Sequence, residues 1–476
     1  MTLYHQIANQ LGRQIQQGLY PAHARLPGVR RLSVQFGVSI ATIVQAQQVL
    51  ETQGVIEARP RSGYYIKPQP LSSVNLPKPS KPDLKPMPVT GQELVLQLAQ
   101  NTQYHNVVQL GAAVPSVDFM PMRAFQRSLA KTVRQYGHLA AKYAFPPGIE
   151  SLQTQIAKRM YYSGVVIPPE PILITNGCQE ALFIALRTIA KAGDIIALES
   201  PTFYGLLQVI DALGMKALEI PSDPRTGISL AALELALEQW PIAACVLTVN
   251  FSNPLGSVMP YAQRQHLLQL AQRYQLCLIE DDIYGDLGFN GERPRSLLSF
   301  EDNPLQGQTL YCSSFSKTVA QGTRIGWLIV PERYQQRATY LKYVSNLAAP
   351  TLPQLALADF LEHGGYERYL RQVRGRYAQQ VQIYTQAILR YFPSDTRVSQ
   401  PQGGFVLWVE LNKQINTLEL VQQALTQGIS VAPGQIFSAS QKYQHCLRIS
   451  CAQCFTPTVE QALQTLGQMC QQCLVS

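Results

Sequence analysis

Five short, continuously apolar runs alternate with helix-like stretches through the middle of this 476-residue chain. Strands that are buried on both faces and alternate with helices form a mainly parallel sheet, so the pattern predicts an α/β fold. In such sheets, ligands bind beyond the carboxyl ends of the strands. The alternation therefore also indicates where a functional site lies. The runs occupy 171–174, 195–198, 244–249, 276–279 and 309–311, and helices are expected at 179–191 and 261–275.

Polar residues follow four of these runs directly. Gly177 opens a helix after the first run, and the free N–H groups of a helix N-terminus suit a phosphate. Asn253 follows the third run, and Asp281 stands at the end of the fourth. Lys317 comes after the fifth run among hydroxyl residues, seven positions before Arg324. Polar groups at neighbouring strand ends predict one shared pocket.

One cofactor matches this set of side chains. Pyridoxal 5'-phosphate has an aldehyde for a lysine, a pyridine nitrogen for a carboxylate, a ring oxygen for amide and phenol donors, and a phosphate. An amine attacks a carbonyl carbon only when it is deprotonated, which a shielded pocket favours. A single lysine is usually a solvated surface charge. The residues around Lys317 are what make it a candidate.

The first 68 residues carry a net charge of +5 and the pattern of a winged helix-turn-helix. Helices are expected over 2–19, from 26–32 onward, and from a cap at Ser39 to about residue 53, followed by a two-stranded ribbon over 54–66. The third helix would enter the major groove of double-stranded DNA, and the ribbon would contact the backbone or minor groove. A generic basic surface also explains the charge. The alternative to DNA binding is a decayed helical cap that binds nothing, against which the retained charge of +5 counts.

Seven prolines interleaved with lysines occupy 68–88 and predict an extended, semi-rigid spacer. We therefore expect a DNA-binding domain over 1–67, a linker over 68–100 and a body over 101–476. The body would have a large part at about 140–345 and a small part at about 346–476. No apolar run approaches the roughly 18 residues that span a bilayer, and the start lacks a signal-peptide pattern. The expected location is the cytoplasm, with no membrane partner.

Four cysteines near the end have a spacing that zinc sites use. Cys451, Cys454, Cys470 and Cys473 read C-x2-C-x15-C-x2-C. However, Cys451 closes a β-like run and the last two fall in a helix-like stretch, whereas zinc-binding pairs usually occupy tight turns. We expect buried thiols and no metal.

The first 67 residues resemble the GntR family of bacterial repressors. By that resemblance, the DNA-contacting residues are Arg30, Ser39, Thr42, Arg59, Arg61 and Gly63. The chain has Gly28 where many relatives have serine, Ile40 where many have arginine, and Val44 at a position that is often basic. The matching words are Leu3-Tyr4-His5-Gln6-Ile7, Arg25-Leu26-Pro27, Val29-Arg30-Arg31-Leu32, Val38-Ser39, Leu50-Glu51-Thr52-Gln53-Gly54 and Ala58-Arg59-Pro60-Arg61-Ser62-Gly63.

Residues from about 105 to 470 resemble the fold-type I aminotransferases, and a GntR-like head on such a body resembles the MocR-type regulators. The resemblance implies a mainly parallel sheet with a smaller C-terminal α/β subdomain. The matching words are Pro201-Thr202-Phe203-Tyr204, Asn253-Pro254-Leu255-Gly256, Asp281-Asp282-Ile283-Tyr284, Ser314-Phe315-Ser316-Lys317, Arg324-Ile325-Gly326-Trp327, Gln402-Gly403-Gly404-Phe405 and Leu447-Arg448-Ile449-Ser450.

This resemblance assigns roles by position. Lys317 would bind the aldehyde of pyridoxal 5'-phosphate covalently, and Asp281 would pair with the pyridine nitrogen. Arg448 would bind the carboxylate of an amino acid, or it forms an ordinary internal ion pair. Ala113 stands where many aminotransferases have glycine. Asn253 and Tyr284 would donate to the ring oxygen, Phe203 would stack on the ring, and the phosphate would contact Gly177, Cys178, Gln179, Ser314, Arg324 and Tyr143 of the partner subunit.

Three functions are compatible with these features. The first is a transcriptional regulator that senses pyridoxal phosphate, or an amine or amino acid that reacts with it. The second is an active aminotransferase with a residual DNA-binding head, and the third is a DNA-binding protein on an inactive scaffold. A homodimer is expected because Tyr143 would complete a neighbour's site and operators usually mirror two-fold symmetry.

Overall fold

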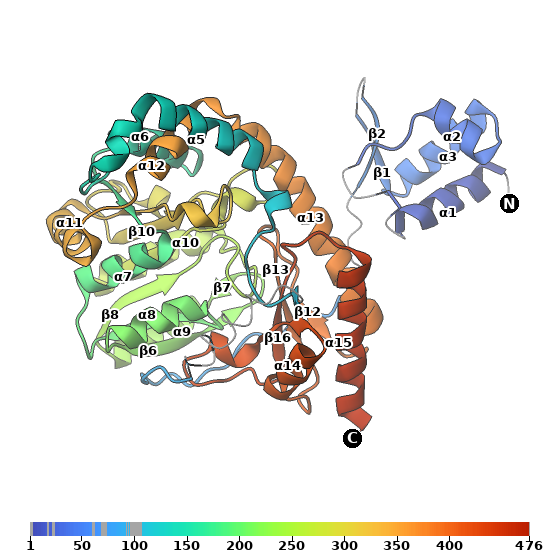
Figure 1. Cartoon of the computed structure of the whole chain (residues 1–476). Coiled ribbons are helices and arrows are strands. Elements are labelled where there is room, and N and C mark those ends of the chain that lie inside the picture. Colours follow the sequence, from blue (N-terminus) through green and yellow to red (C-terminus); the bar gives the residue numbers. More distant parts are fainter. Residues whose placement is uncertain are drawn as a thin grey trace. The chain divides into compact units, whose positions relative to one another are not determined.

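The computed structural model describes residues 3–16, 19–20, 24–59, 62–67, 74–91, 93, 95 and 107–475. The chain divides into two compact units, which we call the head (Met1–Val74) and the body (Asn75–Ser476) (Figure 1). Arg61 and the first residues of the predicted linker, 68–73, lie outside the described residues.

The head is a winged helix-turn-helix, as the sequence predicts. Helix α3 begins after Ser39, whose hydroxyl accepts a hydrogen bond of 3.1 Å from the backbone N–H of Thr42. Gly37 ends the preceding helix with φ of 62°, a conformation that favours glycine. The core contains Leu11, Leu32, Ile43, Leu50 and Ile66. The elements are α1 (Leu3–Gln16), α2 (Val29–Phe36), α3 (Ile40–Thr52) and an antiparallel ribbon of β1 (Ile56–Arg59) and β2 (Gly63–Ile66).

The large part of the body is built on an eight-stranded sheet with the order β4-β11-β10-β9-β8-β5-β6-β7. Strands β6, β5, β8, β9 and β10 pair in parallel, and β11 lies antiparallel between β10 and β4. The five predicted strands are β4, β5, β8, β9 and β10, so the α/β prediction is confirmed; β6, β7 and β11 were not predicted. The strands are β4 (Ile172–Thr175), β5 (Ile195–Ser200), β6 (Lys216–Asp223), β7 (Gly227–Ile228), β8 (Ile242–Leu247), β9 (Cys277–Asp281), β10 (Thr309–Ser314) and β11 (Gly326–Ile329).

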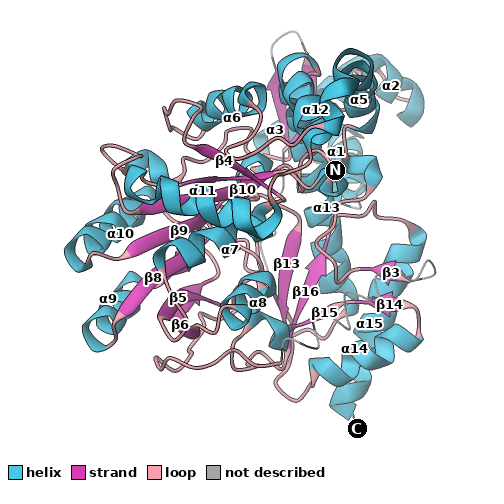
Figure 2. Cartoon of the chain, turned by 60° about the vertical axis from the view of Figure 1, so that its left-hand side comes forward, coloured by secondary structure: helices cyan, strands magenta, loops and turns pink. Residues whose placement is uncertain are grey.

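Helices cover both faces of this sheet (Figure 2). Along β5, Ile196 and Leu198 pack in one core cluster and Ile195 and Ala197 in the other, as the alternation of side chains along a strand requires. One cluster includes residues of α7 (Cys178–Ile189), α8 (Tyr204–Ala212) and α11 (Glu332–Asn346). The other includes residues of α9 (Leu230–Gln239) and α10 (Tyr261–Tyr274).

The small part contains a four-stranded sheet with the order β12-β13-β16-β15. Strand β3 (Val108–Gln109), which precedes α5, pairs in parallel with β14 (Ile429–Ser430), so this early segment of the body packs in the small part. The remaining elements are α5 (Met122–Tyr136), α6 (Glu150–Tyr162), α12 (Thr351–His363), α13 (Tyr366–Tyr391), β12 (Arg397–Val398), β13 (Val406–Glu410), α14 (Thr417–Thr426), β15 (Ala432–Pro433), β16 (Cys446–Ser450), α15 (Pro457–Val475) and the short helices η1 (Val117–Phe119), η2 (Gly137–Ala141), η3 (Gly285–Leu287), η4 (Leu297–Phe300), η5 (Gln321–Thr323) and η6 (Gly434–Phe437).

Residues 75–91, which we call the strap, are extended but bound to the body. Met87 forms a β-bridge to Ala217 at β6, and the side chain of Val89 is buried in the core. The proline-rich composition predicts a spacer up to residue 100, yet the body begins at Asn75 because the apolar side chains between the prolines pack on it. Only residues 68–74 lie between the strap and Lys67, which follows the last strand of the head.

The C-terminal cysteines do not meet as a metal site. Cys451 follows β16 and is buried, Cys470 is buried within α15, and Cys454 and Cys473 are half-buried. Within the described ranges, no group of three or more histidine, cysteine or acidic side chains is placed to hold a metal ion. Among the same residues, no helix combines the length and apolar composition that crossing a membrane requires.

Substitution of Leu32 with alanine should destabilise the head. Leu32 has no exposed surface, so Leu32→Ala should lower the free energy of opening of the head by about 2–5 kcal/mol. Val34 on the same helix is 85% exposed, and Val34→Ala should change it by less than about 0.5 kcal/mol. Hydrogen exchange of the amides in α1 to α3 of the whole chain measures both, and equal effects would contradict this packing.

Candidate functional site

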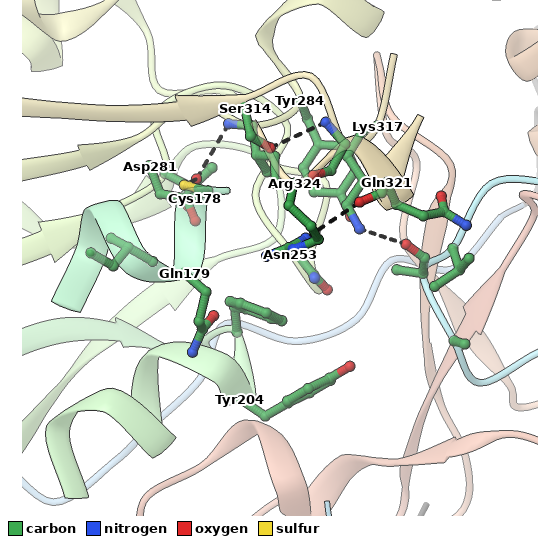
Figure 3. A pocket seen from close by; sticks show the side chains of 18 residues that line it. Cys178, Gln179, Tyr204, Asn253, Asp281, Tyr284, Ser314, Lys317, Gln321 and Arg324 are labelled. Atoms are coloured by element: carbon green, nitrogen blue, oxygen red, sulfur yellow. Dashed lines mark hydrogen bonds between the residues drawn. The ribbon is translucent and has the colours of Figure 1, made fainter. Parts of the chain in front are cut away.

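A cavity of about 270 Å³ lies at the carboxyl ends of β9 and β10. Figure 3 shows side chains from α7, β9 and the segment after β10 converging on it. Most of the residues predicted to hold a cofactor line this cavity: Cys178, Gln179, Phe203, Asn253, Asp281, Tyr284, Ser314, Lys317 and Arg324.

Lys317 is held at the cavity by a contact with a distant part of the chain. Its Nζ donates a hydrogen bond of 2.8 Å to the carbonyl oxygen of Ala113. Loss of hydration lowers the pKa of Lys317 to about 8, and the positive charge of Arg448 acts in the same direction. A larger fraction of the amine is therefore neutral near pH 7 than in an exposed lysine, as a nucleophile requires.

Asp281 presents one carboxylate oxygen to the cavity. Its Oδ1 accepts hydrogen bonds from the thiol of Cys178 at 3.4 Å and from the backbone N–H of Ile283 at 3.3 Å. Its Oδ2 has no hydrogen-bond partner among the residues that the structure describes, and Asp281 lines the cavity. Burial raises the pKa of Asp281 to about 6. The free oxygen suits a ring N–H of a ligand, whose positive charge would keep the carboxylate ionised.

Two glycines let an arginine approach the start of α7. Nη2 of Arg324 donates to the carbonyl oxygen of Asn176 at 2.7 Å, and a Cβ at Gly177 would lie 2.7 Å from the same Nη2. A Cβ at Gly326 would lie 2.5 Å from the carbonyl carbon of Gly177. No side chain caps α7. The helix N-terminus, the guanidinium and the nearby Ser314 form a cradle for a phosphate.

The side-chain amide of Gln179 already forms a hydrogen bond within the protein. Its Nε2 donates to the carbonyl oxygen of Gly205 at 2.7 Å, so this amide orients the start of α8. Phe203 immediately precedes α8, and a Cβ at Gly205 would lie 2.4 Å from its ring. The glycine therefore makes room for the ring at the wall of the cavity.

Tyr284 and Arg448 have buried polar atoms without partners among the residues that the structure describes. Among these residues, the hydroxyl of Tyr284 makes no hydrogen bond, and burial raises its pKa. Arg448 on β16 has no exposed surface; its Nη1 donates to Oδ1 of Asn253 at 3.3 Å, Nη2 donates to the carbonyl of Gly111, and Nε has no partner. Within the described ranges, Arg448 forms no salt bridge, so the internal ion pair considered from the sequence is absent. Arg448 contacts Asn253, which lines the cavity, but Arg448 itself is not part of the cavity lining.

Tyr143 lies apart from the cavity of its own chain. Its side chain is exposed, and its ring centroid lies 5.4 Å from that of Phe145. Phe145 in turn lies 6.1 Å from Tyr343, so aromatic side chains gather on this surface. The role of Tyr143 at the phosphate of a neighbouring subunit remains a prediction.

The predicted DNA-contacting residues occupy different environments in the head. Arg30 is exposed at the start of α2, and Thr42 on α3 shares a 2.8 Å hydrogen bond with Ser39. Arg59 pairs with Glu57 at 2.7 Å. Gly63 has φ of 98°, and a Cβ there would lie 3.4 Å from Nε of Arg25, whereas Arg61 is outside the described residues. The positions where relatives often carry basic residues expose the apolar side chains of Ile40 and Val44.

Residues 3–66 match the family of bacterial regulatory proteins described as gntR, and residues 106–466 match aminotransferase class I and II. The chain is 40% identical to the HTH-type transcriptional regulator YjiR of Escherichia coli, over 98% of each chain. The chain belongs to the MocR-type family. YdcR of the same organism is 36% identical over 99% of this chain and 100% of its own length.

Solved structures match the body of this MocR-type chain. LysN, the α-aminoadipate aminotransferase of Thermus thermophilus, superposes with a TM-score of 0.73 and 26% identity over 80% of this chain and 97% of its own. A multiple substrate aminotransferase from Thermococcus profundus has a TM-score of 0.74 and 23% identity over 80% of this chain and 95% of its own, which shows the shared fold.

Several residues that line the cavity of the MocR-type chain were not singled out from the sequence. Thr248 follows β8 directly, so the rule that ligands bind at strand ends would have found it. Ser316 and Gln321 lie within four positions of Lys317. Tyr204 belongs to one of the sequence words shared with the aminotransferases, but the resemblance assigns it no role. The others have no sequence signal of their own because they are apolar: Ala112, Val114, Leu182 and Ile283.

The lowered pKa of Lys317 should appear as pH-dependent stability in cofactor-free protein. Between pH 8 and 10.5 the unfolded chain binds the lysine proton and the folded chain does not, so this group makes the free energy of unfolding rise with pH. Lys317→Met should stabilise the body by about 1–3 kcal/mol at pH 7, with a smaller gain at pH 10, as urea denaturation can measure.

Lys342 is the matched control. It is buried but bonded to Glu180 at 2.7 Å, so Lys342→Met should destabilise the body by leaving a carboxylate without its partner. Destabilisation by Lys317→Met that does not depend on pH would contradict the assignment of a desolvated amine without a carboxylate partner.

Proposed function

We propose that this protein is a DNA-binding transcriptional regulator whose body binds pyridoxal 5'-phosphate on Lys317. It senses pyridoxal phosphate itself, or an amine or amino acid that reacts with it. The observation that carries the proposal is the convergence of Lys317, the free oxygen of Asp281 and the Arg324 cradle on one cavity, in a chain with a gntR-family head. When bound, the cofactor supplies an aldehyde for amines and a ring that withdraws electrons.

The residues present fit this cofactor. The hydroxyl of Tyr284, which has no partner, and the amide of Asn253 would donate to the ring oxygen. Oδ2 of Asp281 would accept the ring N–H, and the start of α7 with Arg324 would hold the phosphate. The contacts to Tyr284 and to Oδ2 of Asp281 would satisfy polar groups that have no partner among the described residues.

The amino group and the carboxylate of an effector would meet different parts of the body. An amine would react near Lys317 in the large part, whereas a carboxylate would pair with Arg448 on β16 in the small part. Arg448 is buried without a carboxylate partner, a costly arrangement that an amino acid's carboxylate would relieve. This arrangement favours an amino acid over a simple amine.

The strap supports a route from this site to the head. Its Met87 pairs with Ala217 in the large part, and its Thr90 donates to the carbonyl of Ala439 in the small part at 3.2 Å. The backbone carbonyl of Asn75 accepts from Val398, also in the small part, at 2.9 Å. A ligand that binds both parts and prefers one arrangement of them would change the strap, and the strap leads directly to the head.

A homodimer in the cytoplasm completes the proposal. The exposed aromatic surface at Tyr143, Phe145 and Tyr343 supports contact with a second copy, because monomers rarely expose such patches. Tyr143 of the partner subunit would then reach the phosphate. Two heads would match a two-fold symmetric operator, and a regulator of transcription acts where the chromosome lies.

An active aminotransferase is the second candidate. It is favoured by the complete set of Lys317, Asp281 and Arg448, and by similarity to LysN, an aminotransferase at 26% identity. Steady-state transfer of amino groups to a keto acid, without DNA binding, would favour this function over the regulator.

Purified protein should absorb visible light from lysine-bound cofactor, and Lys317→Ala should abolish this band because no other amine of the described chain lines the cavity. Lys191 is exposed and outside the cavity, so Lys191→Ala should keep the band. Absorption spectra of the two variants with added pyridoxal phosphate check this. A colourless parent protein would refute the cofactor.

A fragment of DNA from beside the gene should be retarded in a gel by the whole protein. Arg30→Ala should weaken binding by about 1 kcal/mol or more, roughly fivefold, because Arg30 is exposed at the start of α2 in the helix-turn-helix. Arg13 is also exposed in the head but belongs to α1, so Arg13→Ala removes the same charge and serves as control. Equal weakening in both variants would argue for nonspecific charge alone.

A further inference from the structure

A groove of about 530 Å³ on the body is lined by arginines and has no function in the site described above. It lies between η1, the start of α5 and the start of α13, which are teal and orange in Figure 1. Its apolar floor includes Phe119 and Val373. No acidic side chain of the described chain lines it. Its four basic side chains are Arg123, Arg127, Arg368 and Arg376, which we call the arginine groove.

Three of these arginines make no interaction within the described chain that would stabilise the fold. Arg123, Arg127 and Arg368 are exposed, and within the described ranges they form no hydrogen bond or salt bridge and stack on no ring. Arg376 differs, because its guanidinium lies 4.3 Å from the ring of Phe119 and donates to the carbonyl of Asp118 at 2.6 Å. Exposed arginines that have no carboxylate partner remain available to bind an anion.

The groove gathers positive charge on a body whose net charge is small. The chain carries +9, of which +4 belongs to the body, residues 75–476. The starts of α5 and α13, which border the groove, have no capping side chains among the described residues, and helix starts carry partial positive charge. The groove is therefore a positively charged surface on a body of low net charge.

The spacing of the arginines suits an extended anion better than a small one. Arg123 and Arg127 are one turn apart on α5, about 6 Å along its axis, and Arg368 and Arg376 are about 12 Å apart along α13. Charges distributed along two helices match the repeated phosphates of a nucleic acid, whereas a single phosphate needs groups that converge on one point.

We propose that the arginine groove contacts the phosphate backbone of the DNA that the head recognises. This inference rests on the DNA binding proposed above. It accounts for a feature of the head, where Ile40 and Val44 expose apolar side chains at positions that are often basic in relatives. Contacts to phosphates from the body would supply affinity that these positions do not, and they would position the protein on DNA without reading its sequence.

The test compares the salt dependence of DNA binding in whole, cofactor-loaded protein. The groove variant carries Arg123→Gln, Arg127→Gln and Arg368→Gln, and leaves Arg376 because it packs on Phe119. The control variant removes three exposed charges elsewhere on the body, with Lys191→Gln, Arg225→Gln and Lys413→Gln. Fluorescence anisotropy measures affinity for the gene's own upstream fragment and for an unrelated duplex between about 50 and 200 mM KCl.

The groove variant should bind both duplexes more weakly, and its plot of log K against log salt should become shallower by about 0.9 for each phosphate that the protein no longer neutralises. A slope equal to that of the control variant would overturn the proposal. It would favour an acidic protein segment as the ligand of the groove. The visible band of the cofactor should be unchanged. If the cofactor band disappears in the groove variant, Arg123→Gln, Arg127→Gln and Arg368→Gln are measured one at a time. Salt-dependence slopes equal to that of the parent protein in all three would also overturn the proposal.

The two proposals fail differently. A parent protein that binds no DNA at any salt concentration refutes the regulator, and this inference falls with it. A parent that binds DNA in an Arg30-dependent way, with a groove variant that matches the control, refutes only the contact from the body.

Discussion

Three ionisable side chains lie at or beside one cavity: Lys317 is half-buried, and Asp281 and Arg448 are buried. In the part of the chain that the structure describes, none of them forms a salt bridge. Each is held by weaker contacts: the amine by the Ala113 carbonyl, the carboxylate by a thiol and a backbone N–H, and the guanidinium by a carbonyl and an amide. Burying charged groups without opposite charges costs stability. The strand ends of the parallel sheet bring Lys317 and Asp281 together, and β16 of the small part supplies Arg448. A ligand with complementary charges would relieve the cost.

Much of this site was predictable because it follows local rules. The apolar runs mark β4, β5, β8, β9 and β10, and the polar residue after a strand end marks the site. The resemblance to aminotransferases then assigned Lys317 and Asp281 to specific roles that the residues alone left open. The predicted apolar run 244–249 includes Thr248, so the sequence pattern places this residue inside the strand. In the structure the strand ends at Leu247, and Thr248 lines the cavity.

Other features depend on tertiary contacts that no local pattern encodes. Composition predicts that 75–91 is extended, but whether Met87 and Val89 pack on the body depends on an open edge at β6 and on core residues from Leu173 onward. The arginine groove joins residues of α5 to residues of α13, over 240 positions later, and each arginine alone is an ordinary surface charge. The missing carboxylate partner of Arg448 likewise becomes visible only when every neighbour is placed.

Together these features support the proposed regulator, in which an effector would bind across two parts of the body and the strap would transmit their arrangement to the head. The central claim is that an amino acid changes DNA affinity through Arg448. The most direct test measures DNA binding of pyridoxal phosphate-loaded protein with and without a panel of amino acids, for the parent and for Arg448→Gln. We predict that at least one amino acid shifts the affinity of the parent by about fivefold or more, and leaves that of Arg448→Gln unchanged. An equal shift in both proteins, or no shift in the parent with any amino acid, would contradict the account.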